Sequence, residues 1–447
     1  MNPKSINVED KRFEAQYPQN SRFEEIEKIL KFIKEGKSVQ MISIPGVGRS
    51  NLFGLLAFNR NVRIAHLGEN EQTKMHFVFI NLSEMRKRPL VDVTKFIFLS
   101  LVDSLRERNI LEDYKKIDQI FKDYIASNDE LVIFQGLKKT IDYLALEKDL
   151  TVVFLLDKFQ SYLPYLTPSF FTNLRSLRDR AKYKFSVVFS LSRPLIEILE
   201  SEIIEDFYEF LEGNVVYLRI EDEEGLKFRI NYVQKTSGVK IDQEVIDIIK
   251  KLTGEHGKLT RICLEEYSVK QNSTQDLREF LMSKNRVQGV LYAIWKTFTP
   301  QEREILEEIS NVTEIPSYLI DIQIIKNRKI SIPLFQDYLK IKGEEEKNKP
   351  LVYDEDKDEI RKGETVYSNG LTSLEFKLLK FLMLNQAKIM PRDDVINAVW
   401  GDLKSTQGVT DQAIDQLIFR LRKKIEENPD SPRLVQTIKG RGLSFTQ

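Results

Sequence analysis

The chain has 447 residues, of which 41% are hydrophobic and 30% are charged, as in an ordinary soluble globular protein. The 68 basic residues balance the 68 acidic residues, which excludes a general attraction to nucleic acid and leaves only a local basic patch. A single cysteine, Cys263, excludes an internal disulfide, and because no apolar run reaches membrane-spanning length we expect a cytoplasmic protein without a membrane partner.

The first strand-like run leads into a glycine-rich turn. Residues 39–44 are short and apolar, residues 45–50 read Pro-Gly-Val-Gly-Arg-Ser, and a helical pattern follows. A strand, a glycine-rich turn and a helix N-terminus form a common phosphate-binding arrangement, because their backbone N–H groups point at the anion. The P-loop pattern G-x-x-x-x-G-K-[ST] is met only in part, since Ser43 replaces the first glycine and Arg49 replaces the lysine.

Three further apolar runs, at residues 77–82, 152–157 and 185–192, predict the rest of a parallel sheet because helical stretches separate them. The second run ends at Asp157, where a Walker B strand would carry its Mg²⁺-linked carboxylate. The next residue is Lys158, where a glutamate would polarise the attacking water. A protonated lysine cannot act as that base, so we expect no efficient ATP hydrolysis and name no catalytic residue.

Together these features make residues 22–342 resemble the AAA+/STAND-type ATPases of signal transduction and origin recognition. The resemblance includes Asp157-Lys158-Phe159 in place of Asp-Glu-Phe, Ser192-Arg193-Pro194 after a sensor-like strand, and a lid-like segment at residues 254–261. It implies an ATP or ADP site with Mg²⁺ held by Ser50 and Asp157. The nucleotide-binding residues that it implies are Gly46, Gly48, Arg49, Ser50, Asp157 and Arg261. The residues leave a second interpretation open, in which the module is a nucleotide-free scaffold that binds a partner.

The last hundred residues carry a second set of patterns. A β-like lead-in at residues 351–367 precedes Thr372-Ser373-Leu374-Glu375, a capping box that opens a helix, and a second helix covers residues 393–400. A third helical pattern at residues 410–425 separates an apolar face from a polar face. The apolar face holds Ile414, Ile418, Leu421 and Ile425, and the polar face holds Gln412, Gln416, Phe419, Arg420 and Lys423.

Two short β-like runs around Gly440-Arg441-Gly442 close the chain and predict a hairpin with a cation at its tip. Residues 412–447 contain seven basic and four acidic residues, which suffices for salt-dependent contacts with phosphates. Amide and cationic side chains of this kind read base edges and bind the nucleic-acid backbone. The predicted DNA-binding residues are Gln412, Gln416, Phe419, Arg420, Arg422, Lys423, Lys439 and Arg441.

This region resembles the winged helix of OmpR/PhoB-type response regulators over essentially its whole length. The motifs are Leu371-Thr372-x-x-Glu375-Phe376, Val399-Trp400-Gly401, Arg420-Leu421-Arg422-Lys423-Lys424 and Lys439-Gly440-x-Gly442. The resemblance implies that the third helix enters the major groove of double-stranded DNA while the wing enters the adjacent minor groove. Leu417, Leu443 and Gln412 depart from the family pattern, so base preference cannot be transferred.

We therefore predict a multidomain α/β protein with winged helices. The expected parts are a degenerate P-loop α/β domain at 1–220, a helical lid at 221–282, a first winged-helix-like domain at 283–342, a flexible charged linker at 343–350 and a C-terminal winged helix at 351–447. The predicted function is sequence-specific transcription regulation on double-stranded DNA, with the P-loop module as sensor and self-association left open. The alternative is a STAND-type signalling ATPase whose winged helices mediate assembly.

Overall fold

The structure is a computed structural model that describes residues 12–447 apart from 109–110, 270–275, 348, 364, 369–370, 402–410 and 427. Thr410, the predicted first residue of the third C-terminal helix, and Asn348 of the predicted linker lie outside the described residues. The chain forms two compact units, Met1–Leu339 and Lys340–Gln447. Within the described part, no helix combines the length and apolarity that crossing a lipid bilayer requires.

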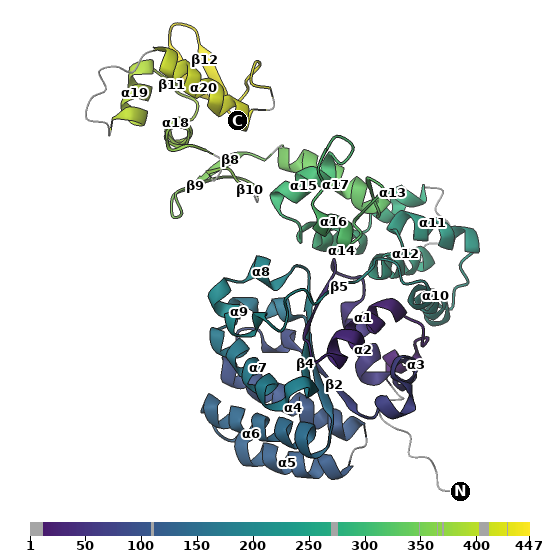
Figure 1. The fold of residues 1–447 in the computed structure, drawn as a ribbon. Helices are drawn as coiled ribbons and strands as arrows, with labels where there is room; N and C mark the ends of the chain where they lie inside the picture. The colour runs from purple at the N-terminus through teal and green to yellow at the C-terminus, as the bar shows by residue number, and fades with distance from the viewer. Residues whose placement is uncertain are drawn as a thin grey trace. The chain divides into compact units, whose positions relative to one another are not determined.

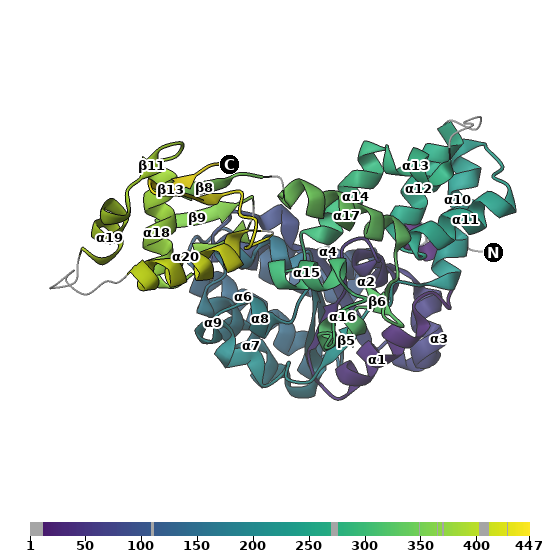
Figure 2. The same cartoon turned by 90° about the horizontal axis from the view of Figure 1, so that it is seen from above.

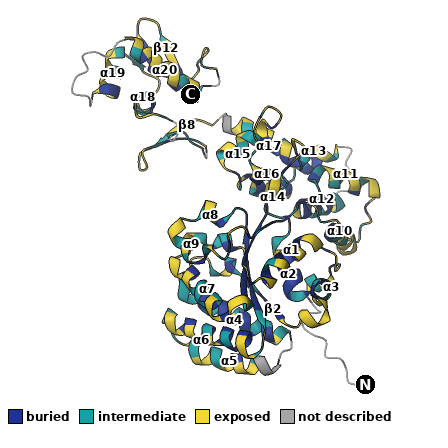
Figure 3. Ribbon diagram, in the orientation of Figure 1, coloured by how far each residue is buried: buried dark blue, intermediate teal, exposed yellow. Residues whose placement is uncertain are grey.

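A five-stranded parallel sheet with the order β2-β3-β4-β1-β5 forms the centre of the first unit (Figure 1). The strands are β1 (Val39–Ile42), β2 (Met75–Asn81), β3 (Thr151–Asp157), β4 (Phe185–Leu191) and β5 (Val215–Tyr217). Figure 3 shows this sheet as largely buried, as expected when helices cover both of its faces. The predicted parallel-sheet α/β fold class is confirmed.

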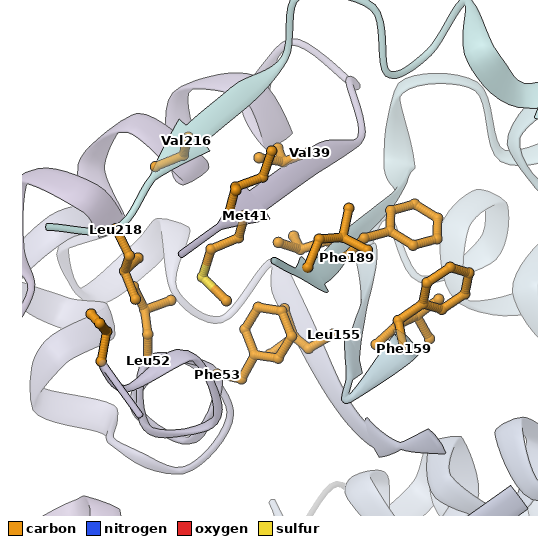
Figure 4. Close-up of a cluster of buried hydrophobic side chains, with 14 of the residues drawn as sticks. Val39, Met41, Leu52, Phe53, Leu155, Phe159, Phe189, Val216 and Leu218 are labelled. Carbon is orange, nitrogen blue, oxygen red and sulfur yellow. The ribbon is translucent and has the colours of Figure 1, made fainter. Parts of the chain in front are cut away.

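Helices lie on both sides of the sheet (Figures 1 and 2). On one side are α1 (Phe23–Lys34), α2 (Arg49–Phe58) and α3 (Arg60–Glu71); on the other are α4 (Leu90–Glu107), α5 (Leu111–Ile125), α6 (Glu130–Asp142), α7 (Pro168–Ala181), α8 (Leu195–Ile198) and α9 (Ser201–Tyr208). Figure 4 shows Met41 of β1 among the side chains of α2, and Phe159 beside Phe189. The rings of Phe159 and Phe189 meet edge to face with centroids 4.9 Å apart, a favourable aromatic geometry.

A mostly helical region completes the first unit. Its elements are α10 (Glu223–Ser237), α11 (Gln243–Thr253), α12 (Gly257–Val269), α13 (Leu277–Met282), α14 (Asn285–Trp295), α15 (Pro300–Glu307), α16 (Ser317–Asp321), the hairpin of β6 (Ile325–Lys326) and β7 (Lys329–Ile330), and α17 (Pro333–Lys347). The helix α15 begins at a reciprocal capping box that Thr299 and Glu302 form. Cys263 is buried in α12, and burial raises the pKa of its thiol to about 12, as suits a packed side chain.

Arg193 and Tyr318 join this helical region to the sheet. Arg193, two residues beyond β4, forms an ion pair with the capping-box residue Glu302, and its guanidinium lies 4.6 Å from the ring centroid of Tyr318. The Tyr318 hydroxyl donates a hydrogen bond to the carbonyl of Ser192 at 2.6 Å. The helices α15 and α16 are therefore anchored at the C-terminal end of a central strand.

The second unit begins with an antiparallel sheet and continues as three helices and a hairpin. The elements are β8 (Leu351–Asp354), β9 (Glu359–Lys362), β10 (Thr365–Val366), α18 (Ser373–Leu384), β11 (Ile389–Met390), α19 (Arg392–Trp400), α20 (Asp411–Ile425), β12 (Val435–Ile438) and β13 (Gly442–Phe445). β11 and β12 both pair with β13 in antiparallel register. The predicted capping box at Thr372 and Glu375 is present, with both of its hydrogen bonds. The predicted C-terminal winged helix is confirmed.

The charged segment after the first unit differs from its prediction. We expected residues 343–350 to be a flexible linker, but α17 continues to Lys347. The segment is rich in glutamate and lysine, which have high helix propensity, and Pro350 follows only after the helix has ended. The composition was typical of a solvated segment, but it does not exclude an exposed helical turn.

Gly442 and Gly440 provide a matched pair that tests the wing. Both have positive φ. A Cβ atom at Gly442 would lie 2.0 Å from the Met390 carbonyl oxygen, whereas a Cβ atom at Gly440 would have no described atom within 4 Å. Gly440→Ala should therefore lower the free energy of unfolding by only about 1 kcal/mol, and Gly442→Ala by clearly more, roughly 3 kcal/mol. Urea denaturation of the full chain measures both; equal losses would contradict the close packing of β11 on β13.

Candidate nucleic-acid interface and candidate phosphate site

The helix α20 has the two faces that its pattern predicted. Ile414, Ile418, Leu421 and Ile425 are buried in the second unit, together with Leu417. The five residues of the polar face, Gln412, Gln416, Phe419, Arg420 and Lys423, are all exposed. The Lys423 ammonium lies 4.7 Å from the centroid of the Phe419 ring, so these two side chains form one cation–π pair on the surface. The exposed face offers amides, cations and one aromatic ring to a partner.

Arg422 of α20 is bound within the unit. Its Nε donates to the carbonyl of Val435 at 2.9 Å, and its Nη2 donates to the hydroxyl of Thr437 at 2.8 Å. Both partners lie on β12, the first strand of the wing. Arg422, predicted to contact DNA, thus fixes the angle between α20 and the wing in this structure.

Glu426 strengthens the same junction. Its carboxylate accepts hydrogen bonds from the backbone N–H groups of Arg433, Leu434 and Val435 at 2.8 to 2.9 Å. Hydrogen bonds to a charged acceptor are stronger than neutral ones, so this cluster holds the start of β12 against the end of α20.

The wing ends in a short cationic turn. Lys439, Gly440 and Arg441 connect β12 to β13, and all three residues are exposed. The N–H group of Arg441 donates to the carbonyl of Ile438 at 2.9 Å, which closes the turn. The predicted cations of the hairpin, Lys439 and Arg441, therefore stand at its tip.

Three ion pairs, which the sequence patterns did not reveal, hold the two ends of α20. Arg392 of α19 contacts Asp411 at 3.0 Å and Asp415 at 2.6 Å, near the start of α20. Near its end, Lys424 contacts the buried carboxylate of Glu375 at 2.6 Å. Burial alone would raise the pKa of Glu375, but the hydrogen bonds from Lys424 and Thr372 outweigh it and lower this pKa. The exposed face of α20 is thus presented by a rigid helix.

In the first unit, the glycine-rich turn at residues 45–48 is held by its carbonyl groups. His256 donates through Nε2 to the carbonyl of Pro45 at 2.8 Å, and the N–H group of Lys258 donates to the carbonyl of Gly46 at 3.1 Å. Arg22 donates to the carbonyl of Val47 at 2.8 Å. A Cβ atom at Gly46 would lie 2.7 Å from the His256 ring, so glycine is required there. Three successive carbonyls are therefore bound from α12 and Arg22.

The N–H groups of the same turn remain available. Among the described residues, none of the hydrogen bonds outside helices and strands uses an N–H group from Gly46 to Asn51 as its donor. Gly48 has φ +126°, and α2 begins at the next residue, so these donors belong to a helix N-terminus. Such a group of donors favours an anion. The predicted phosphate-binding residues Gly46, Gly48 and Arg49 are brought together here, and Ser50 is exposed on the first turn of α2.

Arg49 and Asp157 bring two opposite charges to this site. The Nη1 atom of Arg49 and the Oδ1 atom of Asp157 are both buried, and neither has a hydrogen-bond partner among the described residues. Burial lowers the pKa of Arg49 to about 10, and the carboxylate of Asp157 is the strongest influence that opposes this shift. Lys158 follows Asp157 in left-handed backbone conformation and is exposed. Buried groups without partners indicate a place where a ligand or water completes the hydrogen bonding.

A pocket of about 380 Å³ adjoins α2 and combines aromatic with cationic residues. Phe13, Tyr17, Asn51, Arg229, Tyr232 and Arg261 line it. Arg229 donates to the hydroxyl of Tyr17 at 3.0 Å. Arg229 also lies close to the turn, because its Nη2 atom is 3.6 Å from the position that a Cβ atom at Gly48 would take. Arg261, predicted as a nucleotide contact, also forms an ion pair with Glu265 at 2.8 Å. The turn therefore has a neighbouring cavity where an aromatic ring could stack.

The groups at the turn have the chemistry that suits the phosphates of a nucleotide. Unpaired N–H donors and guanidinium groups suit phosphate oxygens. Mg²⁺ takes oxygen ligands, usually one or two carboxylates together with phosphates and waters. Of the two residues predicted to hold it, Ser50 is exposed, and Asp157 is buried with an Oδ1 atom that has no hydrogen-bond partner among the described residues.

The sequence patterns missed several residues of this site. Arg22, Tyr17 and Arg229 come from three separate stretches of the chain, and no spacing connects them to the turn. One weak signal was present in the sequence. If the lid-like segment at residues 254–261 contacts the turn, the helices next to that segment must also lie near the turn. Their roles depend on tertiary packing that local periodicity does not record.

Comparison with known proteins supports the architecture of the second unit. Residues 368–445 match the family described as "Transcriptional regulatory protein, C terminal". The phosphate regulon transcriptional regulatory protein PhoB of Escherichia coli K12 is 32% identical over 119 residues, which are 27% of this chain and 46% of that protein. The chain spans less than half of the length of the first curated relatives that it matches. Residues 368–445 therefore form a transcriptional regulatory C-terminal domain of the OmpR/PhoB type.

Two solved structures complete the comparison. The DNA-binding domain of Klebsiella pneumoniae RstA, in complex with the RstA box, is 26% identical, and the match covers 21% of this chain and 89% of that one, with a TM-score of 0.18. A Walker-type ATPase of Pyrococcus abyssi is 15% identical, with coverage of 74% and 99% and a TM-score of 0.44. The first unit itself has the parallel-sheet core that its resemblance to AAA+ ATPases predicted.

His256 makes the stability of the turn dependent on pH. Its Nε2 donates to Pro45 while its Nδ1 accepts from the N–H group of Leu259 at 3.2 Å, which only a neutral ring can do. Burial lowers the pKa of His256 from 6.5 to about 4. The unfolded chain therefore takes up a proton first as pH falls. Stability should decrease between pH 6.5 and 4 by roughly 3 kcal/mol from this residue.

Urea denaturation at pH 7 and at pH 4.5 measures this effect. His256→Gln, which keeps a donor for Pro45 but does not titrate, should lose less stability over that interval than the wild type. His76, whose pKa burial also lowers, contributes equally to both proteins and serves as the internal control. An identical loss in the two proteins would contradict a neutral His256.

Proposed function

We propose that the protein is a transcription regulator that binds specific double-stranded DNA sequences through its C-terminal unit. The observation that carries this proposal is the exposed polar face of α20 beside the cationic tip of the wing. Gln412, Gln416, Arg420 and Lys423 are exposed on a helix whose opposite face is buried, which is the requirement for a helix that enters the major groove.

The proposal divides the work among the residues. Gln416 and Arg420 have side chains of the kind that bind adenine and guanine edges, and Phe419 can pack on a thymine methyl group. Lys423, Lys439 and Arg441 supply charge for phosphates, with the wing tip placed for the adjacent minor groove. Arg422 acts indirectly, because its hydrogen bonds to β12 set the distance between helix and wing.

A binding measurement with a charge-matched control tests this function. A pool of random-sequence duplexes is first selected on the full chain, and affinity for the selected sequence is then measured by gel shift. Arg420→Ala with Lys423→Ala should weaken binding by about 10-fold or more, since each such contact contributes about 1–3 kcal/mol. Lys357→Ala with Lys388→Ala removes the same charge from exposed positions outside α20 and the wing tip, and should have little effect.

The competing function is a signalling ATPase whose winged helices serve in assembly. In that case no duplex sequence is enriched, and neither double variant changes binding. Equal weakening by both double variants would reveal nonspecific attraction only, because that depends on total charge.

We further propose that the first unit is a sensor that binds a purine nucleotide without efficient hydrolysis. The specific support is the group of N–H donors at residues 46–51, for which the described residues provide no acceptor, beside a pocket lined by Tyr17, Tyr232 and Arg229. Phosphates match the turn and Arg49, while a base can stack on the aromatic rings. Lys158 occupies the place of a water-activating carboxylate, so slow or absent turnover follows.

Equilibrium binding of fluorescently labelled ATP to the full chain tests the nucleotide site. Arg49→Gln should weaken binding by at least 10-fold, roughly 1.4 kcal/mol, because a buried cation is lost. Arg106→Gln, an exposed position on α4, is the control and should not change it. Phosphate release should stay at background in the same samples. ATP hydrolysis by the wild type that Ser50→Ala abolishes would contradict the sensor proposal and would show that the protein is an ATPase.

A further inference from the structure

We propose that a cavity between α2, β2 and α4 is a binding site for a small organic cation that carries a guanidinium group on a short apolar chain. The cavity has a volume of about 360 Å³, which is the size of a site for a small ligand. None of the residues that line it belongs to the glycine-rich turn or to α20, so the site does not depend on nucleotide or DNA binding. Its support comes from aromatic rings, from unpaired carboxylate charge and from a cation of the chain that already lies there.

The aromatic lining of the cavity comes from the edge strand of the sheet and from two helices. Phe58 ends α2, Phe79 lies in β2, and Phe96 lies in α4. All three rings are half-buried, and the centroids of Phe58 and Phe79 lie 5.8 Å apart. Phe79 and Asn81 are the two half-buried residues of β2, and both line the cavity. Because an aromatic ring has a negative face that attracts cations, this lining favours a ligand with an apolar chain and a positive charge.

Carboxylates dominate the charge of the same lining. Four acidic residues and one basic residue line the cavity, namely Glu14, Glu84, Asp103, Glu107 and Arg12. Asp103 is paired with Arg106 at 2.9 Å, and Glu84 accepts a hydrogen bond from the amide of Asn81 at 3.1 Å. The carboxylate of Glu14 has neither a hydrogen bond nor an ion pair within the part of the chain that the structure describes. Glu14 is therefore available to a cationic ligand.

The position of Glu14 depends on a glycine inside α2. A Cβ atom at Gly54 would lie 2.5 Å from Cγ of Glu14 and 3.1 Å from its carboxyl carbon, so any larger residue at position 54 would displace this side chain. Glycine destabilises the interior of a helix relative to alanine. The helix therefore contains a residue that lowers its own stability and brings an unpaired carboxylate to the cavity.

Arg12 shows which chemistry the cavity accepts. Its guanidinium carbon lies 4.6 Å from the centroid of the Phe58 ring, and its Nη2 atom forms an ion pair with Glu107. An aromatic ring and a carboxylate are the groups with which proteins bind guanidinium ions. Phe96 and the carboxylate of Glu14 line the same cavity and offer a second set of such groups to a ligand.

The presence of Arg12 determines the direction in which its removal changes affinity. Loss of this side chain frees the Phe58 ring and the Glu107 carboxylate and removes a like charge, so a cationic ligand should bind more tightly. An anionic ligand should respond in the opposite direction, because Arg12 is the one basic residue among the described residues that line the cavity.

The experiment measures binding of butylguanidinium to the full chain by isothermal titration calorimetry and by ligand-observed NMR. Butylurea, an uncharged molecule of nearly the same shape, is the matched control ligand. We expect saturable binding of butylguanidinium with a dissociation constant of about 1 mM or lower, and no saturable binding of butylurea. Arg12→Ala should bind butylguanidinium more tightly by about threefold or more, and Glu14→Gln should bind it more weakly by about the same factor.

Two further variants separate the cavity from the overall charge. Glu205→Gln removes the same charge from an exposed position on α9 and should leave the affinity for butylguanidinium unchanged. Gly54→Ala displaces Glu14 without changing any charge and should weaken binding as Glu14→Gln does. Thermal unfolding of each variant verifies that it is folded.

Equal affinity for butylguanidinium and butylurea, or no saturable binding of butylguanidinium, would overturn the inference, and both outcomes are measured on the wild type alone. Weaker binding of butylguanidinium by Arg12→Ala would also overturn it, because the arginine would then belong to a site for another kind of ligand. Equal weakening by Glu14→Gln and Glu205→Gln would show attraction to the overall charge and no site in the cavity.

Discussion

The neutral imidazole of His256 is the interaction on which the phosphate site depends. By donating to Pro45 and accepting from Leu259, the ring ties the glycine-rich turn to the start of α12. Lys258 and Arg22 bind the next two carbonyls, while the N–H groups from Gly46 to Asn51 find no hydrogen-bond acceptor in the part of the chain that the structure describes. The conformation of the turn is therefore a product of tertiary packing as much as of its glycines.

The second unit uses the same principle with different groups. Side chains that could have faced a ligand are bound within the unit instead. Arg422 of α20 and Glu426, the residue just after this helix, both bind β12, the strand that begins the wing. Arg392 and Lys424 secure the helix at either end. What remains exposed is a small set of amides and cations on a rigid support, an arrangement in which recognition geometry is defined before any partner arrives.

The sequence predicted the fold well where burial imposes a period. The strands at residues 75–81, 151–157 and 185–191 lie where apolar runs placed them, and the stripe from Ile414 to Ile425 is buried as expected. The site was predictable only where a local motif exists, at the glycine-rich turn. Arg229, Tyr17 and Arg22 were not predicted because they lie far from the turn and from one another in the sequence. Arg422 shows that a cation in a basic run can form hydrogen bonds within its own domain. The charged end of α17 shows that composition alone does not distinguish a linker from a helix.

The contact of Arg193 with Glu302 has a practical consequence for dividing the chain. Glu302 both caps α15 and pairs with Arg193, while Tyr318 satisfies the carbonyl of Ser192. If residues 12–282 were expressed without the helices that follow, Arg193 and Ser192 would lose these partners, and side chains at the end of β4 would become exposed. Fragments that end beyond α17 keep these contacts and are therefore the better choice for expressing the first unit separately.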